Sequence, residues 1–214
     1  MKLSIILLVL TVGCFSCATT LHPIVTEENI IVDNRLYGNW KTDTTTVMIE
    51  NYLKSSLNTS SYPGETDKLL NPKTAKEKRL SAFASKLYTI SYWNKGYNYV
   101  LTGQLTKING QLYMDLEAED IKSEEDVQGS YNYKKAHLIA KLDVVNNSLK
   151  FQFMDGQKIK DLVLSGRVKL KHEYEKLFDT FVITASTRDL RLFLEKYGKD
   201  QSLYPANNIV SLTK

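Results

Sequence analysis

The feature that most constrains the fold is an alternation of apolar and polar side chains around the pair Asn109 and Gly110. Both central residues of a type I′ turn need positive φ, and Asn-Gly is a preferred pair for that conformation. Leu112, Met114 and Leu116 follow at every second position, which places them on one face of a strand. The pattern predicts a β-hairpin centred on residues 109–110.

The same period of two recurs along most of the chain. Apolar side chains at even spacing predict strands within residues 44–49, 87–93, 97–105, 136–144, 149–153, 168–174 and 181–185, with a second hairpin turn at 146–148. Residues 209–212 predict a last edge strand. Alternation with one polar face is typical of antiparallel sheet, and many short strands are typical of a barrel.

Two helices are expected late in the chain. Residues 157–164 form a short amphipathic pattern. Ser186 is a favourable N-cap for a helix in which Leu190, Phe193, Leu194 and Tyr197 share one apolar stripe. The expected fold class is therefore β-rich (α+β), with an antiparallel curved sheet or small barrel of about eight strands and two late helices.

The chain divides into few parts. Residues 17–34 hold no periodic apolar pattern and are expected to form a tether. Residues 35–214 show no internal repeat and no second composition regime, so we expect one β-rich domain. Residues 54–79 turn polar around a Pro63-Gly64 pair and are expected to form a long loop or insertion within that domain.

The N-terminus has the pattern of a secretory signal. Lys2 precedes an apolar run over residues 3–12, and small residues follow it. That run is about half of the ~20 residues that a membrane-spanning helix needs. The pattern therefore predicts a signal sequence over residues 1–16.

The two cysteines make this segment resemble a bacterial lipoprotein signal, in which a cysteine thiol receives a lipid before cleavage. The recipient is Cys17 if the motif is Cys14-Phe15-Ser16-Cys17, or Cys14 if it is Thr11-Val12-Gly13-Cys14. We favour Cys17, which allows the longer apolar run. The resemblance implies a diacylglycerol and an N-acyl chain such as palmitate, which together anchor stably. It places the domain in the bacterial cell envelope, at the periplasmic side of the outer membrane.

The sequence holds little that points to catalysis. Both cysteines lie within the first 17 residues, and the three histidines, His22, His137 and His172, are widely separated. No nucleophile elbow, phosphate-binding loop, zinc-ligand spacing or EF-hand order occurs, so we predict no metal and no cofactor, and no sequence motif indicates an enzyme. The 28 Lys and Arg exceed the 24 Asp and Glu by only four, which does not favour nucleic acid.

The motif Gly38-Asn39-Trp40 resembles the Gly-x-Trp start of lipocalins and related small barrels. In that family the tryptophan closes the base of the barrel and the cavity binds apolar ligands. The resemblance implies a lipocalin-like domain that binds a small apolar molecule. Trp40, Tyr97, Tyr99 and His172 are the candidate ligand-binding residues.

Several segments between residues 88 and 210 are similar to a widespread family of uncharacterised bacterial envelope lipoproteins. They include Gly110-Gln111-Leu112-Tyr113, Lys171-His172-Glu173 and Thr184-Ala185-Ser186-Thr187. That family has no assigned activity, so the resemblance implies no catalytic residue. The leading hypothesis is a non-catalytic lipid-anchored protein that binds an apolar ligand or an envelope component. The alternatives are an assembly lipoprotein with a tyrosine-rich contact surface and, third, an envelope hydrolase.

Overall fold

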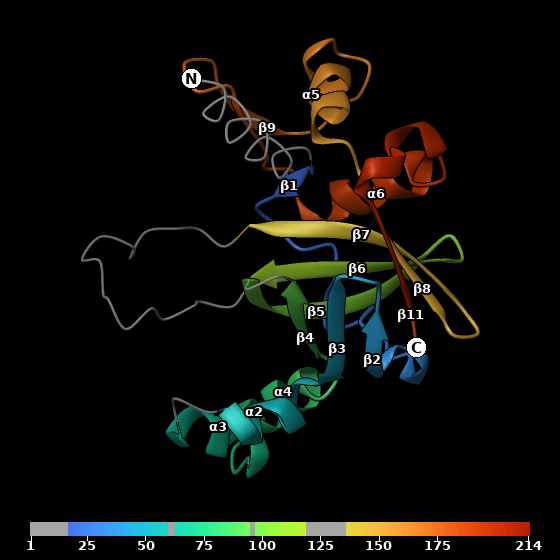
Figure 1. Ribbon diagram of the computed structural model, residues 1–214. Coiled ribbons are helices and arrows are strands. Elements are labelled where there is room, and N and C mark those ends of the chain that lie inside the picture. Colours follow the sequence, from blue (N-terminus) through green and yellow to red (C-terminus); the bar gives the residue numbers. More distant parts are fainter. Residues whose placement is uncertain (1–16, 60–62, 95–96, 119–135) are drawn as a thin grey trace, which may run out of the picture.

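A computed structural model describes residues 17–59, 63–94, 97–118 and 136–214. Its centre is a closed antiparallel β-barrel of eight strands, each hydrogen-bonded to its neighbours in chain order (Figure 1). The strands are β2 (Gly38–Lys41), β3 (Thr45–Asn51), β4 (Tyr88–Asn94), β5 (Tyr97–Ile108), β6 (Gln111–Ala118), β7 (His137–Val145), β8 (Ser148–Phe153) and β11 (Ile209–Thr213). The prediction of a β-rich small barrel with late helices is confirmed.

The strand over residues 209–212 is not an edge. β11 inserts between β8 and β2 and so closes the barrel. It pairs with β8 over five residues but with β2 only through Thr213 and Lys41. The Lys214 ammonium lies 4.6 Å from the centroid of the Trp40 ring and donates to the Arg35 carbonyl, which adds a second contact across this narrow seam.

The two predicted hairpins form. Asn109 and Gly110 have φ of 48° and 84°, and Ile108 pairs with Gln111 across the turn. The second turn has Asn146 at φ 51°. Positive φ is tolerated by asparagine and glycine, so the sequence specifies these turns locally.

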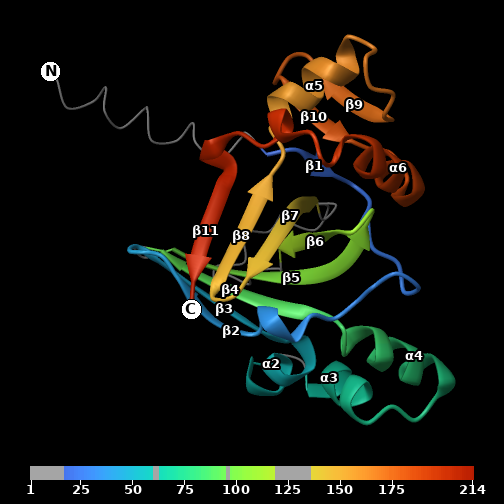
Figure 2. The ribbon, with the colours of Figure 1, turned by 90° about the vertical axis from the view of Figure 1, so that its right-hand side faces the viewer.

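A smaller sheet extends from β7. It contains β1 (Thr19–Thr20), which pairs antiparallel with β7 and parallel with β10 (Thr180–Ile183), and the hairpin of β9 (His172–Glu175) with β10. Helices α5 (Gly156–Leu164) and α6 (Thr187–Tyr197) lie at the same end of the molecule in both ribbon views (Figures 1 and 2). The predicted cap of α6 is present, because the Asp189 amide donates to the Ser186 hydroxyl over 3.2 Å.

Residues 54–79, which we expected to form a long loop or insertion, are an insertion built of helices. It forms α2 (Tyr52–Thr59), α3 (Pro63–Leu70) and α4 (Ala75–Ala84) at the opposite end of the molecule from α5 (Figure 2). Thr74 and Glu77 make a reciprocal capping box that starts α4. Short, mostly polar helices show weak apolar periodicity, so the sequence of residues 54–79 does not reveal that the insertion is helical.

The chain forms two hydrophobic cores on the two faces of one barrel wall. The inner core fills the barrel around Trp40, Tyr88, Leu105, Met114 and Leu149, each with 0% of its surface exposed. The outer core lies between the wall and the segments that cover it, including α5 and α6. Its members include Ile24, Tyr113, Ile159, Leu190 and Leu194. Strands β6 and β7 are therefore buried on both faces.

Residues 17–34 do not form the tether that we expected. Ile24, Val25 and Ile30 are buried in the outer core, and β1 is hydrogen-bonded into the small sheet. The N-terminal segment leads into the 3₁₀ helix η1 (Asn34–Leu36), whose Leu36 side chain enters the inner core. The apolar positions are irregularly spaced because most of this segment, apart from β1, has irregular backbone.

Gly198 is expected to be intolerant of a side chain. A Cβ at this position would overlap the hydroxyl of the buried Tyr113, so Gly198→Ala should lower the free energy of unfolding by about 1–3 kcal/mol, as overpacking does. Chemical denaturation measures this. The double variant Gly198→Ala/Tyr113→Phe should recover part of the loss. A loss in the double variant equal to the sum of the losses in the two single variants would contradict the contact.

Candidate functional site

The barrel has a filled end and a partly exposed end. At the filled end, Trp40 donates its indole N–H to the Leu36 carbonyl over 2.7 Å, and both side chains are fully buried. At the other end, five inward-facing apolar side chains are only partly buried. This set, which we call the mouth, consists of Tyr92, Leu101, Leu138, Phe153 and Val210.

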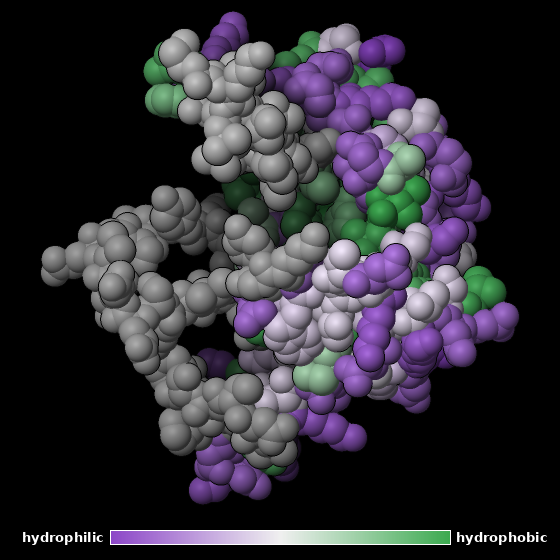
Figure 3. Space-filling view, viewed as in Figure 1, coloured by the Kyte–Doolittle hydropathy of each residue, from purple (hydrophilic) through white to green (hydrophobic). Residues whose placement is uncertain are grey.

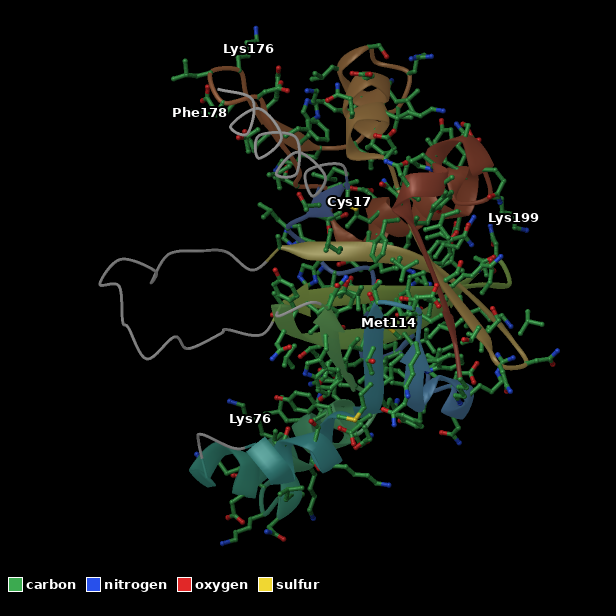
Figure 4. The ribbon with its side chains drawn as sticks, in the orientation of Figure 1. Cys17, Lys76, Met114, Lys176, Phe178 and Lys199 are labelled. Carbon is green, nitrogen blue, oxygen red and sulfur yellow. The ribbon has the colours of Figure 1, made fainter. Side chains whose placement is uncertain are left out.

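The mouth is shallow because the next residues inward are closely packed. Leu105, Met114 and Ala140 each have 0% of their surface exposed, so no water-sized space touches them. Figure 4 labels Met114 within the barrel. Figure 3 shows apolar surface below α6 and at the level of β7, where the outer core lies between the barrel wall and its cover. The site therefore suits a short apolar group at the barrel end better than a ligand enclosed at its base.

The structure does not bring the four predicted ligand-binding residues together. Trp40 lies in the filled end, where no ligand reaches it. Tyr99 is 47% exposed at the rim of the mouth and lies with its ring centroid 6.2 Å from that of Tyr92. The side chain of Tyr97 lies outside the part of the chain that the structure describes. His172 is in β9, outside the barrel, where its Nδ1 lies 2.9 Å from the Leu170 carbonyl oxygen.

The predicted lipidation site lies at the start of the described chain. Cys17 is half-buried and forms a β-bridge with Asp155, while the amide of Ala18 donates to the Met154 carbonyl over 3.2 Å. Gly156 lies so close that a Cβ there would come within 3.0 Å of the Cys17 carbonyl group. The alternative, Cys14, lies outside the described residues.

A buried polar pair lies on the outer face of the same wall. Asp115 has 0% of its surface exposed, and its Oδ1 lies 2.7 Å from Nδ1 of His137. Its Oδ2 accepts the backbone N–H of Ile24 over 2.7 Å. Sequence alternation placed Asp115 and His137 on the polar side of their strands, but that side is covered by residues 19–25.

Two further polar contacts hold this cover in place. Arg191 of α6 donates to the Ile24 carbonyl over 3.0 Å and to the Thr106 hydroxyl over 3.2 Å. The Thr106 hydroxyl in turn donates to the carbonyl of Asn29 over 3.0 Å. These hydrogen bonds join the N-terminal segment, β5 and α6. The buried polar groups on this face therefore have a structural role.

Lys141 is also buried on the outer face of β7, with 3% of its surface exposed. Its ammonium lies 3.8 Å from the centroid of the Tyr204 ring and 3.4 Å from Oε1 of Gln201. Burial lowers the pKa of Lys141. The Tyr204 ring covers this amine, so the position of Lys141 is explained by its packing against Tyr204 and does not indicate a catalytic lysine.

Within the described ranges, no three His, Cys, Asp or Glu side chains are placed to hold a metal ion. In the same part of the chain, no helix is both long enough and apolar enough to cross a bilayer. Comparison with family models, with curated proteins and with solved structures finds no match to this chain.

Replacing Asp115 with asparagine tests the role of the buried pair. Asp115→Asn replaces the carboxyl group that faces His137 and accepts the Ile24 amide, so we expect a loss of about 2–3 kcal/mol in the free energy of unfolding. Hydrogen exchange should quicken most at the Ile24 amide. The control is Asp43→Asn, on an exposed position. Equal stability of the two variants would show that the pair does not hold the segment.

Proposed function

We propose that this protein is a non-catalytic lipoprotein of the bacterial cell envelope, anchored through Cys17 and binding a short apolar group in the mouth of its barrel. The observation that carries the ligand part is the contrast between the partly exposed apolar mouth and the closed core beneath it. Small-molecule sites are concave, mostly apolar and preformed, and the mouths of β-barrels are a common place for them.

The proposed ligand is an acyl or other unbranched apolar segment and not a bulky ring system. The mouth has few polar groups and little depth, because Leu105 and Met114 close it from within. The Tyr92 hydroxyl accepts a hydrogen bond from Nδ2 of Asn94 over 3.1 Å, so this polar group is already engaged within the protein. A headgroup would therefore stay outside in solvent. The envelope component that supplies such a chain is a lipid or a lipidated molecule.

The assembly hypothesis has less support, because the tyrosines do not form one surface. Tyr88, Tyr113 and Tyr204 are buried in the two cores. Among the tyrosines whose exposure the structure describes, Tyr99 alone is classed as exposed. The hydrolase hypothesis would need a cleft with two carboxylates facing each other. Asp115 is instead buried, and its two oxygens contact the Ile24 amide and His137.

The anchoring part is tested by exchanging each cysteine. Cys17→Ser should move the protein from the membrane fraction to the soluble fraction and abolish the lipid mass increment, since the acceptor thiol is lost. Cys14→Ser should leave the anchor unchanged. Release by Cys14→Ser but not by Cys17→Ser would transfer the site to Cys14, and retention of both variants without lipid would refute the anchor.

The binding part is tested with a fluorescent fatty acid that brightens in apolar surroundings. Leu138→Glu places a charge in the mouth and should weaken binding at least tenfold, a loss of about 1.4 kcal/mol or more. The matched control is Leu80→Glu, which alters a 46% exposed leucine of α4 and should bind as the wild type does. Equal binding by both variants, or none by the wild type, would exclude the mouth as the site.

A further inference from the structure

The turn between β9 and β10 exposes two large apolar side chains side by side. Leu177 is 80% exposed and Phe178 is 77% exposed, the highest values among the exposed large hydrophobic residues of the described chain. Lys176 precedes them and is also exposed. A cation beside an apolar tip suits a lipid surface, because the ammonium stays among headgroups while the apolar side chains enter the acyl boundary.

The tip is held firmly on the domain. Asp179 follows Phe178 at φ 51° and accepts hydrogen bonds from Lys160 of α5 over 2.8 Å and from the Tyr174 hydroxyl over 2.7 Å. These two hydrogen bonds, from Lys160 first and Tyr174 second, lower the pKa of Asp179, so the contact is intact at neutral pH. The Phe181 ring packs on His172 at the base of the hairpin, with 5.4 Å between ring centroids.

The tip and the proposed anchor belong to one end of the molecule. β1 runs parallel to β10, with Thr20 beside Ile183. The N-terminal ends of the two strands therefore point the same way. Cys17 precedes β1, and the turn that carries Phe178 precedes β10. Both ribbon views place β1 and the β9–β10 hairpin at the end opposite α2, α3 and α4 (Figures 1 and 2). Figure 4 labels Cys17, Lys176 and Phe178 in this same part of the molecule.

We propose that Lys176, Leu177 and Phe178 form a second membrane contact, which inserts into the interface of the bilayer that carries the lipid on Cys17. The inference rests on the proposed anchor. One lipid attachment fixes the position of a domain but leaves it free to tilt. A second contact from a rigid hairpin restricts that tilt and holds the barrel in one orientation on the membrane.

The test uses the full-length protein, purified in its lipidated form and reconstituted in vesicles of phosphatidylethanolamine and phosphatidylglycerol that carry bromine on their acyl chains. Phe178→Trp places a reporter at the tip. Val145→Trp is the matched control, because Val145 is 64% exposed at the β7–β8 turn on a different part of the barrel. Bromine quenches nearby indoles, and the wild-type protein supplies the background from Trp40 and Trp93.

We expect the added fluorescence of Phe178→Trp to be blue-shifted and quenched several-fold more than that of Val145→Trp. Insertion of an interfacial element reaches about 5–10 Å into the headgroup and acyl boundary, which is within range of bromine near the glycerol end of the chains. Lys176→Glu in the Phe178→Trp background should reduce the quenching, since it reverses the charge beside the anionic lipid. Unchanged thermal unfolding of each variant confirms that the fold is retained.

The outcomes separate the two proposals. Lipid on Cys17 with equal quenching of the two tryptophans would overturn the tip contact and leave the anchor standing. A protein without lipid that does not bind vesicles would overturn both. Preferential quenching at position 178 in a protein without lipid would support the tip contact and refute the anchor.

Discussion

The cover on the outer face of the barrel depends on the buried carboxyl group of Asp115, both oxygens of which are engaged by the protein. Asp115 sits inside the wall between the two cores and accepts from the Ile24 amide, while His137 lies against its other oxygen. Burying a carboxyl group costs free energy unless its oxygens are hydrogen-bonded. Asp115 therefore stabilises the arrangement of the N-terminal segment in which the Ile24 amide donates to it. That segment in turn packs with α5 and α6 in the outer core, and Arg191 of α6 donates to the Ile24 carbonyl.

Local signals in the sequence were enough for the strands and turns but not for what lies on top of them. Asn109, Gly110 and Ser186 act through their own backbone and near neighbours, and each is found as expected. The role of β11 depends on pairing across some 170 residues of chain, which no local pattern reveals. The polar residues Asp115 and Glu117 predict that the outward face of β6 is exposed to solvent. In the structure the N-terminal segment covers Asp115 on this face.

The barrel was predictable from the sequence, but the apolar side chains at its mouth were not. Tyr99 lies at the rim of the mouth, whereas the sequence indicates Leu138 and Phe153 only as strand-forming residues. Period-two alternation identifies which side chains face inward and gives no depth along the barrel. Depth is set by the stagger of neighbouring strands, which is a property of the closed sheet. His172 shares the alternation but belongs to a hairpin outside the barrel.

The position of β11 has a consequence for how the chain matures. Until residues 209–213 are available, the barrel is an open seven-stranded sheet whose two free edges are β2 and β8. Unpaired edges invite pairing with other chains, so the nascent polypeptide carries this aggregation hazard until β11 is in place.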